Sequence, residues 1–132
     1  MARMSGQHTS TTQRAAAVVG GAFGLAGMVA GTRVLSGIDV PDYHVLPWLV
    51  VYNVVTSTVA VVVAIGLWRG RRWAAHAAMG LAGAHGLVLV ALAALRVTGT
   101  GVANDSLAAM GLRTSVWALA AWTASRSRRA HR

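Results

Sequence analysis

The chain has 132 residues, of which 55% are hydrophobic and 11% are charged, and its formal net charge is +9. This length allows one domain and no separate soluble module. The absence of cysteine excludes disulfides, thiol chemistry, iron–sulfur clusters and cysteine-based zinc sites. The positive charge does not predict nucleic-acid binding, because the basic residues bracket apolar segments instead of lining one soluble face.

Four long apolar segments follow one another along the chain, at residues 15–32, 47–68, 73–95 and 106–124. Each has about the 17–25 residues that a helix needs to cross the hydrocarbon core of a bilayer. The first is longer than the apolar region of a signal peptide and has no clear cleavage site, so we expect it to be retained. The sequence predicts an all-α integral membrane protein, with residues 1–132 forming a single membrane domain that is a four-transmembrane-helix antiparallel bundle.

The first segment carries glycines with the spacing 4-3-4, at Gly20, Gly24, Gly27 and Gly31. This spacing places them on one helix face, where small residues let another backbone approach closely. The face suits either dimerisation or packing against the other spans. We favour packing within the chain, because a four-helix bundle needs such contacts in any case.

Arginine placement predicts the orientation. Nine of the twelve arginines lie on one side of the four-span arrangement: Arg3, Arg14, Arg69, Arg71, Arg72, Arg126, Arg128, Arg129 and Arg132. Only Arg33 and Arg96 lie on the other side, so the positive-inside rule places both termini in the cytoplasm. The use of Arg without any Lys is typical of a GC-rich bacterial genome. We therefore expect a bacterial plasma (inner) membrane, with anionic lipid at the cytoplasmic Arg clusters.

Polar residues inside the spans are candidates for function, because they are costly in a bilayer. The candidate intramembrane polar site consists of Asn53, Thr56, Ser57, His85 and Arg113. On antiparallel neighbouring helices, Asn53, His85 and Arg113 are expected to converge on one layer. Tyr52 and Trp117, in contrast, are interpreted as packing or interfacial groups.

Two interpretations of this layer remain open. Arg113 with His85 and Asn53 suits a small-anion or proton-linked site, since they supply a fixed charge, a titratable group and hydrogen bonds. The same residues also suit an interhelical hydrogen-bond cluster that fixes helix register. An Arg at mid-depth costs about 2.5–3.5 kcal/mol, so we expect Arg113 to point inward, toward the second or third span.

No metal or cofactor site is expected. His76 and His85 are nine residues apart, which places them on opposite helix faces and about 13 Å apart along the axis, so they cannot ligate one haem iron. No acid lies at the depth of His85 to complete a metal site or a catalytic triad.

The resulting functional expectation is a small non-enzymatic membrane protein that acts as an accessory or assembly subunit through helix packing. Its partners would be a second copy of the chain or another membrane protein, within the lipid bilayer. The alternative is a minimal oligomeric transporter or channel for a small anion or proton-linked solute. A pathway requires the polar side chains to face a wetted cavity, whereas a packing role requires them to be buried and bonded to one another.

Overall fold

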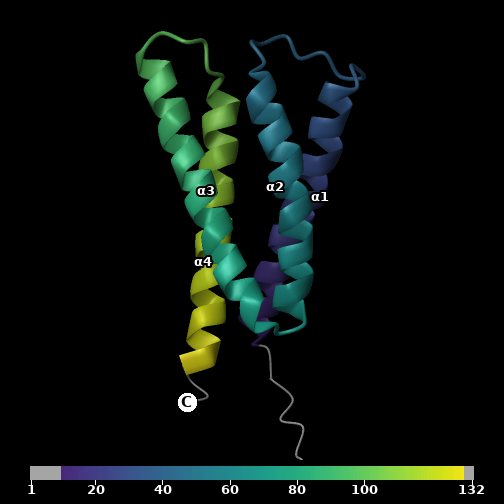
Figure 1. Cartoon of the computed structure of the whole chain (residues 1–132), viewed down its shortest axis with the longest axis vertical. Coiled ribbons are helices and arrows are strands. Elements are labelled where there is room, and N and C mark those ends of the chain that lie inside the picture. The colour runs from purple at the N-terminus through teal and green to yellow at the C-terminus, as the bar shows by residue number, and fades with distance from the viewer. Residues whose placement is uncertain (1–9, 130–132) are drawn as a thin grey trace, which may run out of the picture.

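The computed structural model describes residues 10–129, with side chains described up to Arg126. Arg3 and Arg132, which count toward the predicted orientation, lie outside the described residues. The described residues form four helices: α1 (Thr11–Leu35), α2 (Pro47–Trp68), α3 (Arg72–Val97) and α4 (Asn104–Arg129) (Figure 1). Each contains one of the expected apolar segments. The all-α prediction is therefore confirmed.

The helices form two antiparallel hairpins, α1–α2 and α3–α4, which lie side by side in Figure 1. Contacts between the hairpins join α1 to α4 and α2 to α3. The start of α1, the α2–α3 turn and the end of α4 lie at one end of the bundle, which we call the turn end. The two longer loops lie at the opposite end, the loop end.

Three helices, α1, α2 and α3, are long and apolar enough to cross a membrane. Their 22 to 26 residues span about 33–39 Å at 1.5 Å per residue. The expected multi-pass architecture is therefore supported for three of the four segments. The fourth helix is not among these candidate spans, and Arg113 and its hydroxyl residues explain why its hydropathy is lower.

Glycines with positive φ end α1, α2 and α3. Gly37, Gly70 and Gly99 have φ values of 73°, 67° and 86°, which residues with a Cβ rarely adopt. At Gly70, the N–H donates to the Leu67 carbonyl and the next N–H, of Arg71, donates to the Gly66 carbonyl. This is a Schellman motif, and it lets α3 begin at Arg72, directly after the turn.

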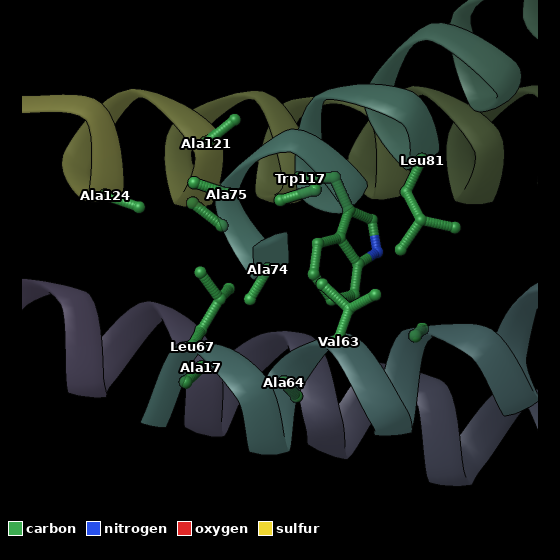
Figure 2. Close-up of a cluster of buried hydrophobic side chains, with 13 residues drawn as sticks. Ala17, Val63, Ala64, Leu67, Ala74, Ala75, Leu81, Trp117, Ala121 and Ala124 are labelled. Atoms are coloured by element: carbon green, nitrogen blue, oxygen red, sulfur yellow. The ribbon is translucent and has the colours of Figure 1, made fainter. Parts of the chain in front are cut away.

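The core at the turn end is built mainly from alanine. It comprises Ala17, Ala60, Val63, Ala64, Leu67, Ala74, Ala75, Ala78, Leu81, Trp117, Ala120, Ala121 and Ala124, from all four helices (Figure 2). Small side chains let the helices approach closely there, and Trp117, with 1% of its surface exposed, fills the space between them. A second, leucine-rich cluster at the loop end contains Leu49, Leu92, Val102 and Met110.

The outward faces of the helices are apolar. They carry large exposed side chains along the full length of the bundle, including Val18, Leu25, Val55, Val62, Leu87, Val90 and Leu119. Four tryptophans, Trp48, Trp68, Trp73 and Trp122, are about half exposed, between 45% and 52%. Indole rings in such positions suit the boundary between lipid and water.

The glycine face of α1 is covered by the chain's own helices. A Cβ added at Gly20 would lie 3.0 Å from the Trp117 ring of α4. A Cβ at Gly24 would lie 3.0 Å from the Ser57 carbonyl oxygen of α2, and Gly31 faces Val54 of the same helix. The face therefore packs within the molecule in this structure, where it brings α1 against both α2 and α4.

Candidate polar site between the helices

Arg113 points into the bundle from α4. Its Nη1 donates a hydrogen bond of 2.5 Å to the Asn53 side-chain carbonyl oxygen on α2. Its Nη2 lies over Gly27 of α1, where an added Cβ would be 2.8 Å from this nitrogen. The inward direction agrees with the sequence expectation. The second helix that it approaches is α1, however, because the bare Gly27 leaves room for the guanidinium.

His85 lies buried on α3 and is paired with Tyr52 of α2. The Tyr52 hydroxyl lies 2.9 Å from His85 Nδ1, and the two rings are nearly perpendicular. The sequence interpretation of Tyr52 as a packing group was incomplete, since this hydroxyl belongs to the polar layer. One signal in the sequence pointed to the Tyr52 hydroxyl. Tyr52 and Thr56 are four residues apart and share one face of α2, and Asn53 lies beside Tyr52.

The hydroxyls of α2 differ in their roles. Thr56 donates to the Tyr52 carbonyl oxygen at 2.7 Å, within its own helix. Ser57 is 5% exposed and sits against Gly24 and Gly27 of α1. Within the described part of the chain the Ser57 hydroxyl has no hydrogen-bond partner. Thr58 is exposed and bonds to the Val54 carbonyl oxygen, so it lies outside the layer.

A small cavity of about 10 Å³, half open to the surface of the bundle, lies in this layer. Its lining comes from α1, α2, α3 and α4 and consists of Phe23, Gly24, Thr56, Ser57, Ala60, His85, Arg113 and Trp117. The volume is close to what one water-sized species requires. On the turn side, Trp117 and the alanine core separate the cavity from the end of the bundle.

A second cavity, of about 70 Å³, opens at the loop end between the hairpins. We call it the vestibule, and its lining is Val34, Pro41, Tyr43, His44, Val45, Leu46, Leu49, Val50, Asn53, Val102, Ala103 and Ser106. Asn53 is the one site residue that lines the vestibule. Because Asn53 also bonds Arg113, it connects the vestibule to the inner polar layer.

Charge compensation is found at the loop end and not in the layer. Arg33 and Asp39 form the only ion pair among the described residues, at 2.7 Å. The hydrogen bond from Arg33 lowers the pKa of the Asp39 carboxyl below its ordinary value. No described carboxylate pairs with Arg113, whose guanidinium therefore brings an uncompensated positive charge among helices α1, α2 and α4.

The other two histidines within residues 10–129, His44 and His76, do not join the polar layer. His76 is exposed near the start of α3, whereas His85, nine residues further along the same helix, is buried. Within residues 10–129, no group of three or more His, Asp or Glu side chains is arranged to hold a metal ion. The polar layer thus contains one imidazole and one guanidinium, joined to α2 by neutral partners.

Comparison with protein-family models, with curated proteins and with solved structures finds no match to this chain.

Proposed function

We propose that α4 also crosses the bilayer, which makes the protein a four-span bundle with both termini in the cytoplasm of a bacterium. The support comes from the fold and from charge. The α4 helix has 26 residues, packs against α3 and contributes Trp117 to the core shared by all four helices. Its one inner charge, Arg113, points away from lipid. The arginine-rich segments all belong to the turn end, which the positive-inside rule assigns to the cytoplasm.

We further propose that the protein is a non-enzymatic accessory or assembly subunit that acts through helix packing. The observation that carries this proposal is the pairing within the polar layer. Arg113 binds Asn53 between α4 and α2, and His85 binds Tyr52 between α3 and α2. Bonds of this kind fix helix register, so the polar side chains hold the two hairpins in one alignment and leave the outer faces for contacts with other membrane components.

The outer surface offers two kinds of contact. Its apolar helix faces suit lipid chains, a second copy of this protein or a spanning helix of another protein. The turn end combines arginines with tryptophans, for Arg14 lies 5.5 Å from the Trp68 ring and Arg126 lies 4.1 Å from the Trp122 ring. Such pairs suit anionic headgroups at the cytoplasmic surface, which attract Lys and Arg near a membrane.

Site-specific photo-cross-linking in cells tests the accessory role. A photoreactive residue replaces Val55 of α2 or Leu87 of α3, which are 57% and 75% exposed, while the buried Val63 serves as the matched control. We expect one membrane protein to cross-link from an exposed position and not from Val63. We also expect its abundance to fall severalfold when the chain is deleted. Cross-links to lipid alone, with unchanged abundance of every membrane complex, would contradict the proposal.

A minimal anion transporter or channel is the second candidate function. The vestibule favours it, because this cavity reaches Asn53 from the loop end. The closed turn end opposes it, since Trp117 and the alanine core leave no wide passage there. Anion efflux from proteoliposomes distinguishes the two. A pathway requires protein-dependent efflux that Trp117→Ala increases, whereas a packing subunit shows the rate of empty liposomes in both cases.

A further inference from the structure

Four side chains around the 10 Å³ cavity present hydrogen-bond donors that the protein leaves without an acceptor. Among the described residues, the Ser57 hydroxyl and the Trp117 indole N–H form no hydrogen bond. His85 uses only Nδ1, toward Tyr52, so its Nε2 is also unpaired. Arg113 has five N–H donors, of which the bond to Asn53 uses one.

Three of these side chains are buried, and Arg113 is partly exposed. The exposed fractions of Ser57, His85 and Trp117 are 5%, 2% and 1%. Figure 2 shows the indole nitrogen on the side of the Trp117 ring that faces Leu81 and away from Ala124. No buried side-chain nitrogen or oxygen in the described part of the chain is sealed off without a partner. The unpaired atoms therefore keep some accessible surface, and the residues that carry them line the cavity.

The chemistry of this lining selects an acceptor that carries negative charge. An indole N–H and a guanidinium only donate, and Ser57 is able to donate as well. When the Tyr52 hydroxyl donates to Nδ1 of His85, the imidazole proton lies on Nε2 and gives a further donor. A water molecule also fits these donors, because the Ser57 oxygen accepts one of its protons, but only a monatomic anion in addition compensates the charge of Arg113.

We propose that this cavity binds one halide-sized monovalent anion, held by Arg113, Ser57, Trp117 and His85. The volume admits one species of about the size of a water molecule, which excludes sulfate and organic anions. Gly24 and Gly27 form part of the site by keeping α1 free of side chains where it faces Ser57 and Arg113. The proposal concerns binding, and it holds independently of transport and of the accessory role.

Thermal unfolding of the full chain in detergent tests this site. Sodium chloride replaces sodium gluconate at constant ionic strength, and sodium bromide and sodium sulfate are tested in parallel. Wild-type protein is expected to show a saturable rise in Tm with chloride and bromide, on the order of 5 °C, since a ligand that binds only the folded state stabilises it. Sulfate should match gluconate. An equal effect of sulfate, or no difference between chloride and gluconate, would overturn the proposal and indicate surface screening or bound water.

Variants localise the effect. Arg113→Gln should abolish the chloride-dependent rise, while Arg96→Gln, at the exposed loop end, should retain it. Ser57→Ala removes one donor with almost no change in packing volume, and Trp117→Phe removes the indole N–H together with part of the ring, so each should raise the half-saturating chloride concentration on the order of tenfold. These two variants decide the question even where Arg113→Gln does not fold. Unchanged half-saturation in both, or a full chloride response in Arg113→Gln, would show that the anion binds elsewhere.

Discussion

The guanidinium of Arg113 on α4 donates to the side-chain carbonyl oxygen of Asn53 on α2 across 60 residues of sequence, at 2.5 Å. This bond joins the second hairpin to the first at the depth where the vestibule ends and the inner cavity begins. Arg113 thereby points into the bundle, where Asn53 holds it without a countercharge. The pair sets the alignment of the hairpins and also leaves a positive charge available inside the bundle.

A double-mutant cycle should reveal this coupling. Arg113→Gln and Asn53→Ala are each expected to lower the free energy of unfolding by about 1–2 kcal/mol, because each leaves the other polar group without its partner. The double variant should lose less than the two single losses added together, by roughly 0.5–1.7 kcal/mol. Reversible unfolding in mixed micelles measures these values. Arg96→Gln is the control, and strict additivity of the two changes would show that the bond contributes nothing.

A methyl group at Gly27 should disturb the layer, because it would meet Ser57 and Arg113 together. Gly27→Ala is therefore expected to lower the free energy of unfolding by about 1–3 kcal/mol through overpacking. Gly80→Ala in α3 is the matched control, since an added Cβ there has nothing within 4 Å. We expect that variant to stay within about 0.5 kcal/mol of wild type. Equal stability of the two variants would mean that α1 does not approach α2 and α4 as closely as the structure shows.

The hydroxyl of Tyr52 should stabilise the bundle through His85. Tyr52→Phe retains the ring and removes the hydrogen bond, so a loss of about 0.5–1.5 kcal/mol in unfolding free energy is expected. The ¹⁵N chemical shifts of the His85 ring should change in the same variant, because Nδ1 loses its partner. Tyr43→Phe at the exposed loop is the control and should alter neither quantity. Identical imidazole shifts in wild type and Tyr52→Phe would argue against the pair.

Reporter fusions test the four-span topology. Fusions after Arg14, Arg71 and Arg132 should all report the cytoplasm, and a fusion at Asp42 should report the opposite side, because the arginines are concentrated at the turn end. The fusion after Arg132 isolates α4, the helix outside the three candidate spans. An external signal from that fusion alone would leave a three-span protein with α4 outside the bilayer core.

The pKa of Asp39 should depend on Arg33. Its folded-state pKa lies below the ordinary value of 3.8, so the ion pair contributes stability above that pH and loses it as pH falls through the lowered pKa. Both side chains are exposed, and the effect on overall stability is therefore small. A ¹³C NMR titration of the Asp39 carboxyl should show its pKa rising toward the ordinary value in Arg33→Gln. An unchanged titration curve would show that the pair does not form in solution.

Sequence reasoning predicted the helices well and the partners of the polar side chains only in part. Four apolar segments of spanning length leave little choice but helices, because backbone groups in lipid must be satisfied within the segment. The glycines of α1 marked a close-packing face for the same local reason, since their spacing alone puts them on one side of the helix. The inward direction of Arg113 also followed from its cost in a bilayer.

Which groups Arg113 and His85 meet was decided only by the tertiary structure. Helix periodicity gives the face and the depth of a residue, but it does not give the rotation and tilt of one helix against another. Those depend on packing, here on Trp117 seated over Gly20 and on alanines that draw the helices together at the turn end. The sequence alone thus determined an all-helical membrane bundle with an arginine inside it. The packing of side chains from four helices decided that this arginine binds Asn53, that Tyr52 reaches His85, and that their remaining donors surround a cavity for one small acceptor.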